Sequence, residues 1–265
     1  MENVINGFIE LNGELIKISS VEDLKDFAAR LGSAFTELSV KDFEKLCDKL
    51  NGEYEKDDCG VFYSKDGRRL FLAPITSNEY LIRTGTIAIA SYAFNWHSYE
   101  AGGILYTNRC IHLKNINKLL IPNSVIAIGS EAFGGNEVIT NVIVSTNLEY
   151  IGHKAFSGCW KMTDFAIPNS LKYIESEAFD GCCNAFKQLV IPESIKHIGS
   201  HAFRKCTTLE KVTFLSKIEN IGSGIFDECD KLAKIVVPKG SSNRFCEQLP
   251  FFADKITENE DDINL

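Results

Sequence analysis

The apolar residues of this chain recur with a fixed period between Ile116 and Gly240. A block beginning Ile-Pro-Asn-Ser-Val-x-x-Ile-Gly-Ser-x-Ala-Phe opens at Ile121, and recognisable copies follow it. Each copy closes on a Phe, and these lie 23, 23, 24 and 23 residues apart, at Phe133, Phe156, Phe179, Phe203 and Phe226. The longer step follows the only copy that doubles its cysteine, as Cys182-Cys183. A period of this length predicts a solenoid in which each repeat forms one coil.

Each copy also carries three apolar positions, spaced three and then two residues apart, in the L-x-x-L-x-L pattern of a leucine-rich repeat. The triplets are Ile116/Leu119/Ile121, Ile139/Val142/Val144, Met162/Phe165/Ile167, Phe186/Leu189/Ile191, Leu209/Val212/Phe214 and Leu232/Ile235/Val237. Because side chains alternate across a strand, the last two members face inward and the residue between them faces outward. A second apolar pair in each copy, such as Leu171 and Ile174, predicts a short strand or turn on the other wall.

The repeats resemble a known family. The combination I-P-x-S-[VL]-x-x-I-x-S-x-A-F-x-x-C is similar to the BspA-like leucine-rich repeat proteins of bacteria and some protists, and the match covers roughly Val61 to Gly240. The resemblance implies a β-rich solenoid, built as a right-handed stack of coils. It also implies non-catalytic recognition, because the family's repeats have no catalytic residues to carry over. Some members of the family are described as surface adhesins for host matrix proteins.

The first 58 residues have a different pattern and predict a small α+β cap. Residues 8–18 alternate apolar and polar positions around Asn12-Gly13, the strongest short signal for a β-hairpin. Two amphipathic helices are expected after the hairpin, over residues 20–31 and 39–50, and each is followed by a glycine. The open end of a solenoid exposes core and needs such a cover. The alternative for residues 1–58 is a partner-specific module.

The solenoid is expected over residues 59–240, and its beginning is irregular. Residues 61–74 predict a hairpin that turns at an Asp-Gly pair, and residues 87–94 already carry the Ile-x-Ser-x-Ala-Phe pattern. Residues 241–265 follow the last repeat. Their apolar positions predict a helical C-terminal cap up to residue 252, and the acidic stretch from Thr257 onward predicts a mobile tail.

One insertion interrupts the early solenoid. Phe94 lies 39 residues before Phe133, which leaves 16 residues more than one repeat, in the region 96–110. These residues predict a protruding loop or an extra hairpin. Insertions in solenoids often carry binding residues, so the aromatic side chains of this segment are candidate partner contacts. They are Trp96, Tyr99 and Tyr106. The alternative is that they pack the enlarged coil.

Charge and hydropathy narrow the classes of partner and compartment. The net charge of −8 comes mostly from residues 1–60, which hold 14 acidic and 7 basic side chains. Without a long basic cluster, nucleic acid is not expected as a partner. No run of 18 apolar residues predicts a membrane span. The N-terminus has neither basic residues nor a continuous apolar core, so a cytoplasmic protein is expected; if the natural start lies elsewhere, a surface or secreted protein is the alternative.

The cysteines and histidines do not form a recognisable reactive site. Four of the nine cysteines occupy one repeat position, at Cys159, Cys182, Cys206 and Cys229, and Asn136 heads this column. A small side chain that donates to backbone is expected there, which predicts buried reduced thiols, with disulfides between neighbouring coils as the alternative. His197 and His201 are four residues apart on strand and turn, without the helical face of a metalloprotease. No catalytic residue, metal site or cofactor is therefore predicted.

The outward position in the middle of each first-wall strand forms a row that is unusually apolar. Its members are Leu120, Ile143, Ala166, Val190, Thr213 and Val236, and five of the six are apolar. Such a row would run roughly 24 Å along a face that the repeat leaves in solvent. Exposed contiguous apolar surface usually marks an interaction site. The same row would also arise from β-propensity alone, or from coverage by the N-terminal segment or by a second copy of the chain.

Together these features predict a non-catalytic scaffold for protein–protein recognition, built on leucine-rich repeats. The ligand is an unidentified protein, and a homo-oligomer is one form that this recognition can take. The alternative function is a bacterial surface adhesin that binds a host extracellular-matrix protein or a glycan.

Overall fold

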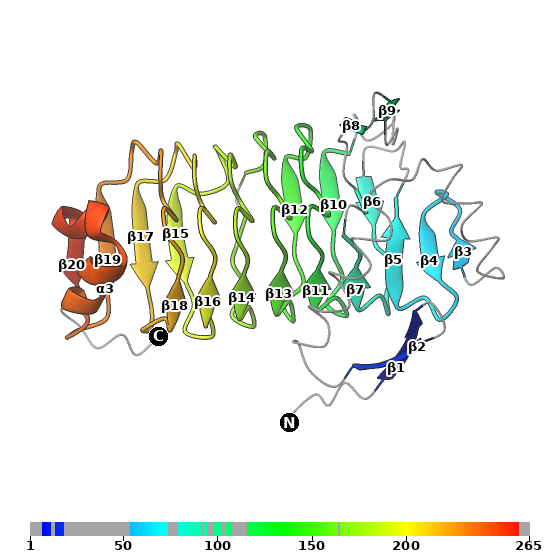
Figure 1. Ribbon diagram of the computed structural model, residues 1–265, viewed down its shortest axis with the longest axis horizontal. Coiled ribbons are helices and arrows are strands. Elements are labelled where there is room, and N and C mark those ends of the chain that lie inside the picture. The colour runs from blue at the N-terminus through cyan, green and yellow to red at the C-terminus, as the bar shows by residue number, and fades with distance from the viewer. Residues whose placement is uncertain are drawn as a thin grey trace.

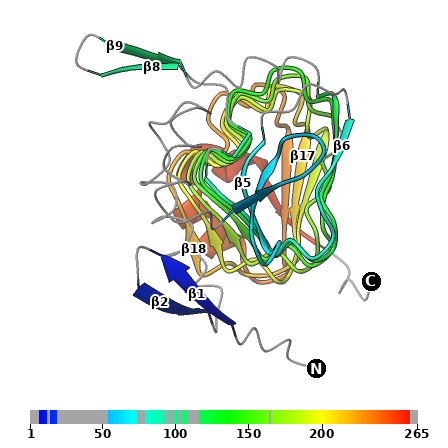
Figure 2. The ribbon, with the colours of Figure 1, turned by 90° about the vertical axis from the view of Figure 1, so that its right-hand side faces the viewer.

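The structure is a computed structural model, and it describes residues 7–11, 14–18, 54–73, 79–91, 93–94, 98–101, 104–107, 116–163 and 165–259. Most of the described chain is one stack of similar coils, with strands on two facing walls (Figure 1). The view along the stack shows successive coils superimposed around a common interior (Figure 2). The predicted leucine-rich repeat solenoid is therefore confirmed.

One wall, called here the continuous wall, is a nine-stranded sheet in the order β18-β16-β14-β13-β11-β7-β5-β4-β3. Its strands are β3 (Tyr54–Lys56), β4 (Phe62–Ser64), β5 (Arg69–Leu72), β7 (Ala88–Ile89), β11 (Ala127–Ile128), β13 (Tyr150–Ile151), β14 (Tyr173–Ile174), β16 (His197–Ile198) and β18 (Asn220–Ile221). From β5 to β18 all neighbours are parallel, and the antiparallel pair β4–β5 is the hairpin predicted over residues 61–74. The second apolar pair of each repeat thus forms a short strand, as predicted.

The facing wall, called here the broken wall, consists of two separate parallel sheets. The first contains β6 (Glu79–Leu81), β10 (Lys118–Leu120) and β12 (Asn141–Ile143), and the second contains β15 (Gln188–Ile191), β17 (Lys211–Phe214), β19 (Lys234–Val237) and β20 (Ile256–Glu258). In β15 the side chains alternate as predicted, with Leu189 and Ile191 buried and Gln188 and Val190 exposed, whereas in β19 the outward residue Val236 is also buried.

A ladder of phenylalanine rings fills the interior between the walls. The rings of Phe156 and Phe179 have centroids 5.4 Å apart with planes 3° from parallel, and Phe179 and Phe203 repeat these values. All three side chains are fully buried. Each ring therefore contributes apolar burial to two interfaces, one on either side of its coil, and no coil could bury its ring alone.

The Asn/Cys column satisfies the backbone at the turn after each Phe. The Asn136 side chain donates to the Phe94 carbonyl at 2.7 Å, and the Cys159 thiol donates to the Phe133 carbonyl at 3.3 Å. Cys182, Cys206 and Cys229 repeat this contact with the preceding coil. These four cysteines are free thiols, so the predicted reduced column and its donor role are confirmed, and the disulfide alternative is wrong for them.

Two hairpins lie outside the regular coils. β1 (Gly7–Leu11) and β2 (Glu14–Ile18) form the predicted antiparallel hairpin. The two helices predicted after it lie outside the described residues, and the division at residue 58 stays a prediction. β8 (Ser98–Ala101) and β9 (Ile104–Thr107) form a hairpin that stands away from the stack (Figure 2), which confirms the predicted extra hairpin.

The C-terminal cap contains α3 (Ser242–Gln248) and a 3-10 helix, η2 (Pro250–Lys255). The ring of Phe245 packs on Phe214 with centroids 4.7 Å apart, so the cap closes the last coils.

The tail predicted from Thr257 begins too early. Residues 256–258 form β20, which pairs with β19, and the Glu258 carboxylate accepts the backbone N–H of Ser242 at 3.0 Å. Bonds from the N–H groups of Gly240 and Ser242 hold the pKa of Glu258 at about 2. The acidic side chain is thus a fixed acceptor, which explains why the charge pattern mispredicted this segment.

Candidate interaction surface

The outward row predicted from the sequence lies in register on the broken wall. Leu81, Leu120 and Ile143 are register partners across β6, β10 and β12. Val190 occupies the same position on β15, the first strand of the second sheet. Leu81, Ile143 and Val190 are 60%, 50% and 50% exposed, and Ala166 between the two sheets is also exposed. Sequence analysis missed Leu81, although the alternation Tyr80-Leu81-Ile82 carries the same signal, with both neighbours buried.

The row is not exposed along its whole length. Leu120 and Thr213 are half-buried, and Val236 is buried at 8% exposure, so its predicted exposure is wrong. The reason is β20, which adds a strand beyond β19 and places Thr257 beside Val236. The exposed apolar part of the row therefore runs from Leu81 to Val190.

The broken wall is interrupted at the coil containing residues 165–167, which lies between β12 and β15 and contributes no strand to either sheet. Elsewhere the backbone N–H at one position of a coil donates to a backbone carbonyl of the coil before it. The Thr163 N–H donates to the Thr140 carbonyl at 2.8 Å, and the Glu210 N–H donates to the Lys187 carbonyl at 2.9 Å. No such bond from Lys187 to Thr163 exists among the described residues, and Phe165 N–H donates to the Ala185 carbonyl at 3.3 Å instead. The residue added by the Cys182-Cys183 pair lies on the turn before β15, so it accounts for the shift on the β15 side of the interruption.

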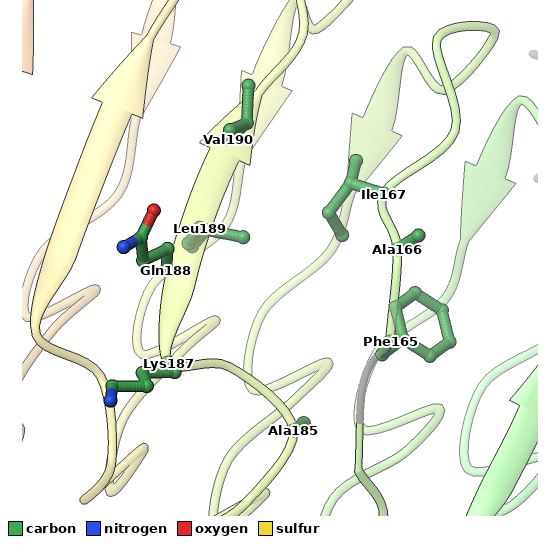
Figure 3. A pocket seen from close by; sticks show the side chains of 8 residues that line it. All are labelled: Phe165, Ala166, Ile167, Ala185, Lys187, Gln188, Leu189 and Val190. Carbon is green, nitrogen blue, oxygen red and sulfur yellow. The ribbon is translucent and has the colours of Figure 1, made fainter.

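The interruption opens a groove of about 460 Å³ on the apolar row. It is lined by Phe165, Ala166, Ile167, Ala185, Lys187, Gln188, Leu189 and Val190. Ala166 and Ile167 lie on one side of it and Val190 on the other (Figure 3). Lys187 directly precedes β15 and lies at the N-terminal end of that strand. Val144 and Ile167 are half-buried, whereas Ile121 and Ile191 at the same repeat position are almost fully buried. The core is thus open to solvent beside Ala166.

Charged side chains border the row unevenly. Glu79 lies at the N-terminal end, 63% exposed, with its carboxylate 3.7 Å from the Lys118 ammonium. Lys211 and Lys234 lie in the same column at the other end. The border is therefore acidic at β6 and basic at β17 and β19.

The N-terminal hairpin does not cover this surface. Figure 2 shows β1 and β2 on the side of β18, away from β6 and β17. Leu81, Ile143 and Val190 expose half or more of their surface. The alternative that the N-terminal segment covers the apolar row stays a prediction for residues 19–53, which lie outside the described residues.

The aromatic residues of the insertion are not part of the row. Tyr99 and Tyr106 are cross-strand partners in the β8–β9 hairpin, which stands away from the broken wall (Figure 2). Trp96 lies outside the described residues. Their binding role stays a prediction, separate from that of the row.

The described residues do not converge on a reactive centre. His197 and His201 each approach a different carboxylate, Glu175 at 3.9 Å and Asp227 at 3.6 Å. In the part of the chain that the structure describes, no group of three His, Cys, Asp or Glu side chains could hold a metal ion. Burial raises the pKa of the Cys159 thiol to about 12, so it stays protonated at neutral pH and is a poor nucleophile. No helix among the described residues is both long and apolar enough to span a membrane.

A stack of parallel coils with a phenylalanine ladder and an Asn/Cys column defines a leucine-rich repeat β-solenoid. The chain belongs to the family described as BspA type leucine rich repeat region, whose model matches in six copies over residues 105–233 and 182–254. This family is typically non-catalytic. The sequence matches none of the curated proteins with which it was compared.

Solved structures of bacterial proteins share the fold. A T. pallidum leucine-rich repeat protein has a TM-score of 0.54 and 23% identity, over 69% of this chain and 77% of that protein. A Bacteroides ovatus leucine-rich repeat protein has a TM-score of 0.53 and 27% identity, over 70% of this chain and 45% of that protein. A leucine rich cell surface protein from Faecalibacterium prausnitzii has a TM-score of 0.51 and 20% identity, over 69% and 54%. The chain thus shares the fold of these bacterial leucine-rich repeat proteins and spans about half of two of the three.

Proposed function

We propose that this chain is a non-catalytic recognition protein that binds another protein through the broken wall. The observation that carries the proposal is the exposure of Leu81, Ile143 and Val190, in one row across the two sheets of the broken wall. Large apolar side chains grouped on a solvated face usually mark a binding surface. Their polar border, from Glu79 to Lys234, provides the rim that surrounds the apolar centre of a typical interface.

The test is quantitative affinity capture with two variants of the chain as bait. Ile143→Asp with Val190→Asp places two charges at the centre of the apolar row, where a docked protein would have to desolvate them. We expect proteins retained by the wild-type chain from a lysate of the source cells to fall by about tenfold or more with this variant. Circular dichroism melting checks that the fold is intact, since both side chains are half-exposed.

Asn220→Asp with Asn243→Asp is the matched control. It adds the same two charges at exposed positions outside the broken wall, on β18 and on α3, and keeps every side chain of the row and its border. Retention with this control and loss with the row variant support the proposal. Equal retention by wild type and row variant contradicts it.

A second candidate is a surface adhesin that binds a host matrix protein or a glycan. It is favoured by the likeness to the F. prausnitzii protein, which is described as a cell surface protein. The cytoplasmic alternative places the partner inside the source cell. Protease added to intact cells distinguishes the two: cleavage of this chain while a cytoplasmic marker survives supports display outside, and protection of both supports the cytoplasm.

A further inference from the structure

We infer that the partner at this surface is a second copy of the chain, packed wall to wall with its coils in reverse order. The inference rests on the proposed function, because it uses the same apolar row. It adds the identity of the partner and the register of the contact. Three features of the broken wall support it: the alternation of large and small side chains, the groove, and the distribution of charge.

The row has the shape of knobs beside a hole. Ile143 and Val190 are half-exposed large side chains, and Ala166 between them is small and borders the groove of about 460 Å³. Phe165, Ile167 and Leu189 give the groove apolar walls (Figure 3). A surface with a knob and a hole one coil apart can complement itself, as a twofold interface between identical chains requires.

One placement of the twofold axis matches each knob to the hole. The axis runs along the strand direction, midway between the coil of Ile143 and the coil of Ala166. Ile143 of each copy then enters the groove at Ala166 of the other, and this contact occurs twice. Leu120 lies against Val190 of the second copy, and Leu81 against Thr213, because these residues follow one another coil by coil on either side of the axis. The strands of the two walls stay aligned, as in common sheet-on-sheet packing.

The charges at the border agree with this register. The same axis brings Glu79 opposite Lys211 of the second copy, and Lys118 opposite Gln188, in the column beside the row. Glu79, which also lies 3.7 Å from Lys118 of its own chain, thus gains a second ammonium partner in Lys211 of the second copy. This complementarity sets the order of the coils, while the apolar contacts supply most of the buried surface.

Three other symmetric arrangements fit the same wall less well. An axis along the stack places Ile143 against Ile143 and leaves the groove facing another groove. An axis through Ala166 also leaves groove against groove, and it places Leu81 against Val236, which is already buried by the C-terminal cap. An axis midway between the coils of Ala166 and Val190 fills the groove with Val190, but it sets Lys118 opposite Lys234 and Leu120 against the buried Val236. The axis midway between the coils of Ile143 and Ala166 is therefore the arrangement that the surface favours.

Sedimentation velocity of the whole chain, at concentrations up to about 200 μM where a weak dimer would still be populated, tests the inference. We expect a dimer, and Ile143→Asp should raise its dissociation constant by about 100-fold, since two charges become buried. Ile143→Ala and Ala166→Ile should each raise it by about tenfold. The double variant should return it to within about threefold of wild type, because each contact again pairs one large and one small side chain.

The rescue distinguishes a second copy from any other partner. A different protein would bind the double variant no better than the single ones, because its own surface is unchanged. A dimer that persists with Ile143→Asp overturns the inference. So does a dimer that is weakened by Ile143→Ala and is not restored when Ala166→Ile is added. A chain that stays monomeric also overturns it, and if the capture experiment still shows loss with Ile143→Asp and Val190→Asp, the proposed function stands with a different protein as partner.

Discussion

At the scale of single residues, the Asn/Cys column shows why one small donor recurs in every coil. The carbonyl of each such Phe accepts a backbone N–H within its own turn, as Phe133 does from Asn136 at 3.2 Å. A carbonyl oxygen has two lone pairs, so the small side chain of the next coil adds a second hydrogen bond in the interior. The thiols of Cys159 and Cys182 donate to these carbonyls at 3.3 and 3.1 Å. Burial raises the pKa of both thiols.

The raised pKa values predict a loss of stability at alkaline pH. For Cys159 the pKa rises from 9.0 to about 12, so the unfolded chain loses this proton first as the pH increases. The unfolded state then binds fewer protons than the folded state, and the free energy of unfolding falls as the pH rises from about 9 to about 12. Urea titrations at a series of pH values measure this fall.

Cys159→Ser is the informative variant, because a hydroxyl keeps a donor at the Phe133 carbonyl but does not titrate in this range. Its alkaline slope should be shallower than that of the wild-type chain. Parallel curves for the two proteins would show that Cys159 does not carry the effect.

At the residue scale, the sequence predicted correctly the features that recur in every coil. The donor role of Asn136 follows from one turn and its neighbour, and both are visible in the repeat. The exposure of Val236 depends on what lies beyond the last repeat. Repetition carries no information about that boundary, so the burial of Val236 beneath β20 could not be predicted.

At the scale of elements, one extra residue affects the strand pairing of the two walls differently. The doubled Cys182-Cys183 position was visible as the single 24-residue step in the Phe spacing. The sequence could not say which wall would absorb it, because a turn can pass the shift to the strand before or after it. In the structure the continuous wall stays paired from β13 through β14 to β16, and the broken wall loses its ladder. The groove in the candidate surface follows from this local choice.

Amide hydrogen exchange can test the break with two equivalent residues. Ile121 and Ile167 both precede the proline of their repeat. The Ile121 N–H donates to the Ile143 carbonyl at 2.9 Å, whereas the Ile167 N–H has no acceptor among the described residues. We expect the Ile167 amide to exchange at least roughly tenfold faster than the Ile121 amide, because local opening costs less where a hydrogen bond is missing. Equal protection, measured by nuclear magnetic resonance, would mean that the wall is closed in solution.

At the scale of the whole molecule, the fold is a one-dimensional stack whose coils depend on their neighbours. The ring of Phe179 contacts rings in the coils on both sides, whereas Phe245 in the C-terminal cap packs on Phe214 at the end of the stack. Such a stack has a stability close to a sum of coil and interface terms. Loss of a Phe ring in the middle of the stack and loss of a Phe ring at its end should therefore destabilise different numbers of coils.

Phe179→Ala and Phe245→Ala provide this comparison, since both remove a fully buried ring. Phe179→Ala should lower the free energy of unfolding by about 3–5 kcal/mol and weaken protection in coils on both sides of it. Phe245→Ala should fray the end first, with faster exchange in residues 211–237 and unchanged exchange in residues 118–128. Phe251→Ala is the control, because this ring is 86% exposed and its loss should change stability by less than about 0.5 kcal/mol. If Phe245→Ala instead lowers protection equally along the whole stack, the coils unfold as one cooperative unit and the cap stabilises all of them.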